Sequence, residues 1–69
     1  MNHYSMTIEW APEDEVYVVS LPEWGPYAKT HGATYEEAVK NGQDVLAMLI
    51  ESATERGEPL PPPRAYATA

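Results

Sequence analysis

The chain has 69 residues, of which eleven are acidic and four are basic, so its formal net charge at pH 7 is −7; it contains no cysteine. This length fits one small domain, and without cysteine there can be no disulfide bond. Because the core of so short a chain seldom contributes more than about 3–5 kcal/mol, we expect a homo-oligomer, a dimer or a tetramer. The negative charge opposes direct contact with nucleic-acid phosphates. It suits a basic protein partner, or it only keeps the surface solvated.

The sequence has no pattern of a membrane or export segment. No apolar run reaches the roughly 18 residues that span a bilayer, and the first residues lack a basic region followed by an apolar one. We therefore expect a cytoplasmic protein that makes no contact with a membrane.

The first part of the chain is typical of a β-hairpin. Apolar and polar residues alternate from residue 4 to residue 10, which indicates a half-buried strand. Its apolar face carries Tyr4, Met6, Ile8 and Trp10. Residues 11–14 are turn-forming, and the β-branched segment 15–21 indicates a second, more central strand.

A loop and a short strand follow the hairpin. Residues 22–26 contain two prolines and a glycine, which predicts a loop that presents Trp24. We consider two roles for Trp24: packing against the domain's own helix, or anchoring a partner. A third strand is expected over residues 27–31.

Thr34 opens the most clearly specified element. Thr34 and Glu37 have the spacing of a capping box, so we predict a helix from Tyr35 to Arg56, ended by Gly57. At 100° per residue one helix face is apolar, and Gly42 on that face indicates close approach to the sheet or to another subunit. The apolar arc contains Tyr35, Ala38, Val39, Gly42, Val45, Leu46, Leu49, Ile50 and Ala53. The opposite arc contains Glu37, Lys40, Asp44, Glu51 and Glu55.

These elements predict the α+β class: a three- or four-stranded antiparallel sheet packed under one long helix, in the order β-β-β-α. The domain should cover residues 1–60, and the proline-rich segment 61–69 should be a mobile C-terminal tail. Within that tail, Ala65–Thr68 is the only candidate for a fourth strand. Without it the sheet stops at three strands or borrows an edge from a neighbour.

The sequence offers no constellation for catalysis, for a metal or for a cofactor. His3 and His31 lack metal-type spacing, and the serines lack a nucleophile elbow. We therefore expect a non-enzymatic protein with no cofactor-binding or metal-ligating residues.

Three stretches have a family likeness: Tyr17–Glu23, which leads a strand into a Pro-Glu turn; His31–Ala38, with glycine, threonine and a double glutamate opening the helix; and Gly57–Pro61, which closes it. In this order and spacing they resemble the HicB antitoxin family, over about residues 3–63. The resemblance implies a reduced ribonuclease H-like fold. It also implies an antitoxin of a type II toxin-antitoxin system, which binds a small basic HicA-type toxin that cleaves messenger RNA and occludes its catalytic histidine.

The sequence departs from the family pattern after the helix. Nothing beyond Leu60 has the pattern of the DNA-binding module that full-length antitoxins carry, so we expect no direct nucleic-acid binding. The alternative is an orphan HicB-like structural or regulatory domain that binds another protein or a small ligand.

The candidate partner-binding residues are the loop tryptophan and the acids that recur along the outer face of the helix. The acids form a docking stripe for a basic toxin or only a solvated helix face. These residues are Trp24, Glu37, Asp44, Glu51 and Glu55.

Overall fold

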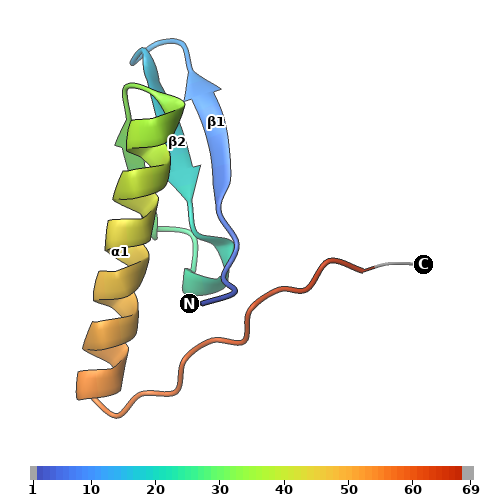
Figure 1. The fold of residues 1–69 in the computed structure, drawn as a ribbon, viewed down its shortest axis with the longest axis vertical. Coiled ribbons are helices and arrows are strands. Elements are labelled where there is room, and N and C mark those ends of the chain that lie inside the picture. Colours follow the sequence, from blue (N-terminus) through green and yellow to red (C-terminus); the bar gives the residue numbers. More distant parts are fainter. Residues whose placement is uncertain (1, 68–69) are drawn as a thin grey trace.

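Figure 1 shows the protein as a computed structural model, which describes residues 2–67. The predicted α+β class, an antiparallel sheet followed by one long helix, is confirmed, and the sheet has three strands in the order β1-β2-β3. The elements are β1 (Thr7–Ala11), β2 (Val16–Ser20), the single 3-10 turn η1 (Pro22–Trp24), β3 (Lys29–Gly32) and α1 (Tyr35–Glu55).

The three strands form two antiparallel ladders. In the hairpin, Ile8 lies opposite Val19 and Trp10 lies opposite Tyr17, so the alternating apolar residues share one face as predicted. Val19 in turn faces Thr30 of β3. The register therefore places β2 in the centre of the sheet, between two edge strands.

β1 begins three residues later than the alternation predicted. The backbone N–H of Ser5 donates to the carboxylate of Glu23, at 3.0 and 3.1 Å, and so does not extend the ladder. The loop after β2 also differs from the prediction, because Pro22–Trp24 closes a 3-10 turn in which the Trp24 N–H donates to the Leu21 carbonyl. Proline at the first position favours such a turn, since its N–H is not needed there.

α1 covers one face of the sheet and lies over β2 and β3, with β1 to its side (Figure 1). The buried apolar side chains are Val19, Leu21, Ala38, Leu46 and Ala53, and the first four form one cluster in the core. The predicted close approach at Gly42 is confirmed: a Cβ there would lie 2.7 Å from Met6 Cε and 3.1 Å from Val19 Cγ1. The helix therefore lies close to the sheet because Gly42 has no side chain.

Both ends of α1 have the caps that the sequence predicted. The Thr34 hydroxyl accepts from the Glu37 N–H at 3.1 Å, and the Glu37 carboxylate accepts from the Ala33 N–H at 3.2 Å. At the other end Gly57 has a φ of 67° and the Glu58 N–H donates to the Ala53 carbonyl at 2.9 Å. The helix ends at Glu55, one residue earlier than predicted.

The segment after α1 turns back under the domain. The Tyr4 hydroxyl donates to the Pro61 carbonyl at 2.5 Å, and the Arg64 N–H donates to Glu23 at 2.9 Å. Beyond this point the chain extends away from the body (Figure 1). Of the candidate fourth strand Ala65–Thr68, residues 65–67 are not in a strand, and Thr68 lies outside the described residues. Within residues 2–67, no helix is both long and apolar enough to span a membrane.

Candidate partner-binding surface

Two of the four helix acids proposed for partner binding already have a contact within the domain. Glu37 caps the helix N-terminus through the Ala33 N–H. Asp44 forms an ion pair with Lys40 at 3.0 Å, and both side chains are largely exposed. A pair this exposed contributes only about 0.3–0.5 kcal/mol, so Asp44 can exchange Lys40 for another cation at low cost.

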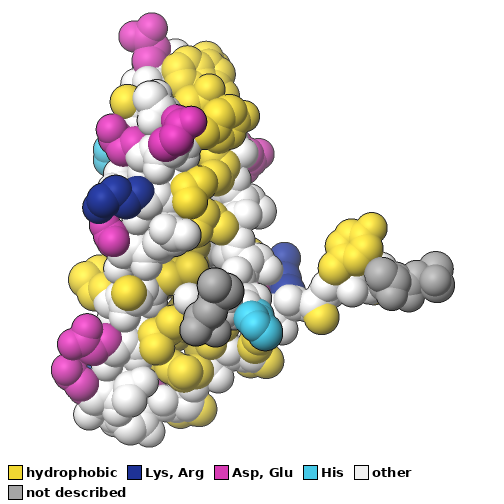
Figure 2. All heavy atoms as spheres, viewed as in Figure 1, with side chains coloured by type: hydrophobic (Ala, Val, Ile, Leu, Met, Phe, Trp, Pro, Cys, Tyr) yellow, Lys and Arg dark blue, Asp and Glu magenta, His cyan; other side chains and the backbone are white. Residues whose placement is uncertain are grey.

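The other two acids lie free on the outer face of α1. Glu51 and Glu55 are exposed and, within residues 2–67, their carboxylates form no hydrogen bond or ion pair. They lie on the same side of the helix as Asp44. Glu51 follows Asp44 by about two turns, and Glu55 follows Glu51 by about one turn. Acidic side chains appear along this side of the molecule in Figure 2. The structure thus brings Asp44, Glu51 and Glu55 into one exposed acidic row.

Two of the four basic side chains add little to the surface charge. Lys40 is paired with Asp44, and Arg56 is paired with Glu58 at 2.6 Å and also donates to the Ser52 hydroxyl at 2.7 Å. The positive charges of Lys40 on α1 and of Arg56 at its C-cap are therefore partly neutralised by adjacent acids. The row of Asp44, Glu51 and Glu55 keeps a negative potential toward solvent.

Trp24 lies against its own domain. Its ring meets the Tyr4 ring edge to face, with centroids 5.3 Å apart, and it packs on the core beside Leu49. The indole Nε1 is buried and has no acceptor within the described residues. Trp24 also lines a cavity of about 450 Å³, together with Leu49, Ala53, Arg56, Glu58, Pro59, Pro61 and Glu23. Of the two roles considered, the structure has the packing one; a role as a partner anchor stays a prediction.

Glu23 links three parts of the chain that are far apart in sequence. Partial burial of its carboxylate opposes ionisation, but the backbone N–H groups of Arg64 and Ser5 donate to it, and the balance lowers the pKa of Glu23 below its ordinary value of 4.5. No sequence pattern indicates this role, because both partners are backbone groups that almost any residue would supply.

A second feature of the surface is an exposed stack of aromatic rings beside the helix N-terminus, in which Trp10 and Tyr17 are packing partners across the hairpin. Tyr17 lies between Trp10, with ring centroids 5.0 Å apart, and Tyr35, with ring centroids 4.3 Å apart. Trp10 is 50% exposed and Tyr35 is 59% exposed. Alternation predicts that Trp10 lies on the face of β1 that packs in the core, and helical periodicity predicts the same for Tyr35. Both are exposed because they lie at the margin of that face, near the ends of their elements.

No element within residues 2–67 covers the face of the sheet opposite α1. This face carries Val16 and Val18 of β2 with Lys29 and His31 of β3, and these residues line a shallow cavity of about 390 Å³. His31 is exposed there. Among residues 2–67, no three His, Asp or Glu side chains are close enough together to hold a metal ion.

Comparisons with known proteins found no matching family model, no similar curated protein and no similar solved structure.

Proposed function

We propose that this domain is a non-enzymatic binding module that neutralises a small basic protein by covering it, as an antitoxin of the HicB type covers a HicA-type toxin. The observation that carries the proposal is the exposed row of Asp44, Glu51 and Glu55, two of whose members have no hydrogen-bond or ion-pair partner among residues 2–67. The agreement of three sequence stretches with the HicB pattern supports the same proposal and names the class of partner.

Occlusion requires only a rigid surface of complementary charge. α1 is fixed at both ends by its caps and along its length by Leu46 and Ala53, so its outer face is presented without much conformational freedom. A preformed surface loses little entropy on binding. Opposite charges accelerate the encounter and exclude acidic competitors, and covering the toxin's active site then blocks access of its RNA substrate.

The test is to co-express the domain with a basic toxin encoded next to it and then to measure binding kinetics. The variant Glu51→Lys/Glu55→Lys reverses the acidic row. Its matched control, Glu13→Lys/Asp14→Lys, makes the same change of charge in the exposed turn between β1 and β2. Because charges on the rim of an interface act mainly on association, the row variant should slow association about tenfold and flatten its salt dependence. The turn variant should do so far less.

Two results would contradict the proposal. Equal slowing by both variants would mean that only the overall charge matters, and unchanged kinetics in both would place the contact on another surface. Failure to find any basic protein that binds would favour the alternative, an orphan HicB-like structural or regulatory domain. The cavity beneath Trp24, bordered by Arg56, is the place where such a domain could take a small ligand.

A further inference from the structure

The two edges of the sheet are not equally available for pairing. On β3, the His31 carbonyl already accepts from Asn41 Nδ2 at 2.8 Å, and Lys29 adds a charge that discourages strand pairing. β1 carries one charged residue, Glu9. Within the described residues, Thr7–Trp10 have no hydrogen bonds other than those of the ladder with β2. The outer edge of β1 is therefore a free template for another strand.

The directions of the backbone groups on β1 follow from the bond to His31. In an antiparallel ladder the N–H and C=O of one residue point to the same side, and successive residues alternate. The His31 carbonyl points away from β2. Val18, which lies opposite His31, therefore directs its backbone N–H and C=O toward β1, where they pair with those of Glu9. The neighbours of Glu9, Ile8 and Trp10, then direct their groups to the free edge.

The apolar side of β1 is only partly covered. Because α1 lies over β2 and β3, Met6 and Ile8 are only half-buried and Trp10 is half exposed. On the side of α1 toward β1, Val39 is 37% exposed. Figure 2 shows hydrophobic side chains running down the molecule between α1 and β1. This band borders the free edge, so a strand added there would meet apolar side chains as well as backbone groups.

We propose that the strand added at β1 is β1 of a second copy, paired antiparallel about a two-fold axis through Ile8. In this register Ile8 faces Ile8 of the second copy and Trp10 faces the second copy's Met6, which joins the two apolar bands. Thr7 faces the second copy's Glu9, so a hydroxyl meets a carboxylate. A shift of the axis to Glu9 would set two carboxylates against each other, which is destabilising.

The paired copies would share one continuous sheet with both helices on the same face. Association would cover Trp10 and the apolar band, which adds buried area to a domain whose largest fully buried side chains are Leu21 and Val19. The acidic row on α1 would stay exposed. This pairing is independent of the proposed function, and neither depends on the other.

The cysteine-free sequence allows a direct test of the register. The variants Thr7→Cys and Glu9→Cys both lie at exposed positions on the uncovered face of β1. In the proposed register, cysteine 7 faces cysteine 9 of the other copy at about 4.5 Å between Cα atoms, whereas identical cysteines are diagonal neighbours at roughly 7–8 Å. Mild oxidation of a mixture should therefore give a disulfide-linked heterodimer, and each variant alone should give little product.

Cross-linking of Glu9→Cys alone as well as the mixture would overturn the proposed register. The absence of cross-linking in all three samples would overturn pairing through β1. Light scattering on the unmodified protein is the second measurement, and a monomer mass at about 100 µM would also overturn the proposal.

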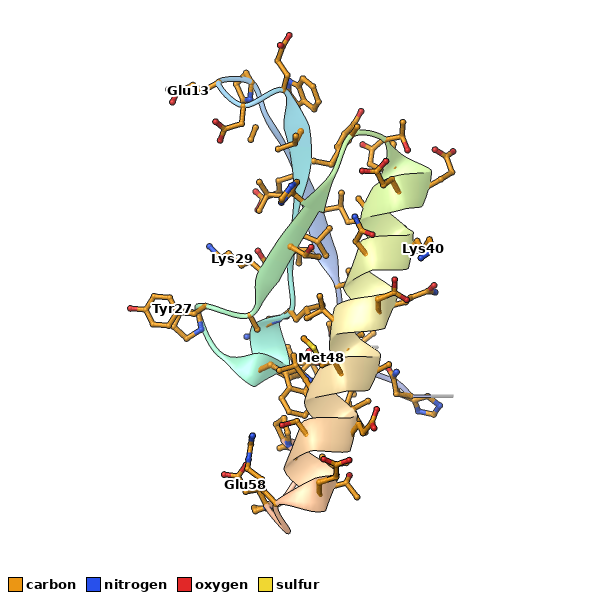
Figure 3. All side chains as sticks on the ribbon, turned by 90° about the vertical axis from the view of Figure 1, so that its left-hand side faces the viewer. Glu13, Tyr27, Lys29, Lys40, Met48 and Glu58 are labelled. Atoms are coloured by element: carbon orange, nitrogen blue, oxygen red, sulfur yellow. The ribbon has the colours of Figure 1, made fainter. Side chains whose placement is uncertain are left out.

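Two substitutions that each introduce a carboxylate distinguish loss of the proposed interface from a general loss of exposed apolar surface. Trp10→Glu places a carboxylate in the proposed interface, whereas Met48→Glu places one at a similarly exposed apolar position on the side of α1 toward β3 (Figure 3). Trp10→Glu should weaken dimerisation roughly tenfold or more, since a carboxylate is costly to desolvate, and Met48→Glu should leave it unchanged. Equal dimerisation of the two folded variants would overturn the proposal.

Discussion

Gly32 lies at the end of β3, where the chain passes directly beneath the first turn of α1. A Cβ at this position would lie 2.4 Å from the Ala38 N and 2.7 Å from the Ala38 Cα, whereas ordinary contact begins near 3.4 Å. Both atoms belong to the helix backbone, so no rotation of a side chain can relieve the overlap. In Gly32→Ala the first turn of α1 must retreat by about 1 Å.

The cost follows from this displacement. Overpacking against movable side chains lowers the free energy of unfolding by about 1–3 kcal/mol. Because the backbone of α1 moves less readily than a side chain, we expect Gly32→Ala to cost at least the upper end of that range. A chain of this length has a free energy of unfolding of roughly 3–10 kcal/mol. A loss of about 3 kcal/mol should lower the melting temperature by roughly 12–24 °C.

Urea and thermal unfolding followed by circular dichroism measure the effect, with all variants at one protein concentration because self-association would add to the stability. Gly42→Ala is the matched control. Its Cβ would lie 2.7 Å from the flexible end of Met6 and 3.1 Å from Val19 Cγ1, so Val19 must shift by a few tenths of an ångström. The substitution also gains about 1 kcal/mol of helix propensity, so the net change should stay within about 1 kcal/mol. If Gly32→Ala cost no more than Gly42→Ala, the close approach of β3 and α1 would be refuted.

Two further predictions concern the core and the link at Glu23. Leu46→Ala, which empties a buried position between helix and sheet, should cost about 2–5 kcal/mol of unfolding free energy in urea, and a loss below about 1 kcal/mol would contradict its burial. Because the folded-state pKa of Glu23 is lowered, its contribution to stability should be complete above the ordinary carboxyl value of 4.5 and lost as the pH falls through the lowered pKa. Unfolding measured at pH 7 and pH 3 should therefore show a smaller acid-induced loss in Glu23→Gln than in the unchanged protein, and equal losses would exclude the link.

The candidate binding residues were only partly predictable. Helical periodicity placed Asp44, Glu51 and Glu55 on one face, because that relation is local and holds for any helix. The same periodicity places Lys40 one turn before Asp44, a spacing at which opposite charges are neighbours, and the structure has this ion pair. The packing of Trp24 against Tyr4 joins residues 20 positions apart, and no local pattern encodes it.

The sequence by itself determined the order of the elements and the two ends of α1 to within one residue: alternation predicted the hairpin, Thr34 and Glu37 set the start of α1, and Gly57 set its end. Each depends on interactions within a few residues, so composition and spacing suffice. Only the tertiary structure decided that α1 lies over β2 and β3 and leaves β1 with a free edge and a half-exposed Trp10. That choice depends on where the helix can approach the sheet most closely. Gly32 and Gly42 permit this approach beside β3 and β2, and their effect depends on atoms brought close by folding.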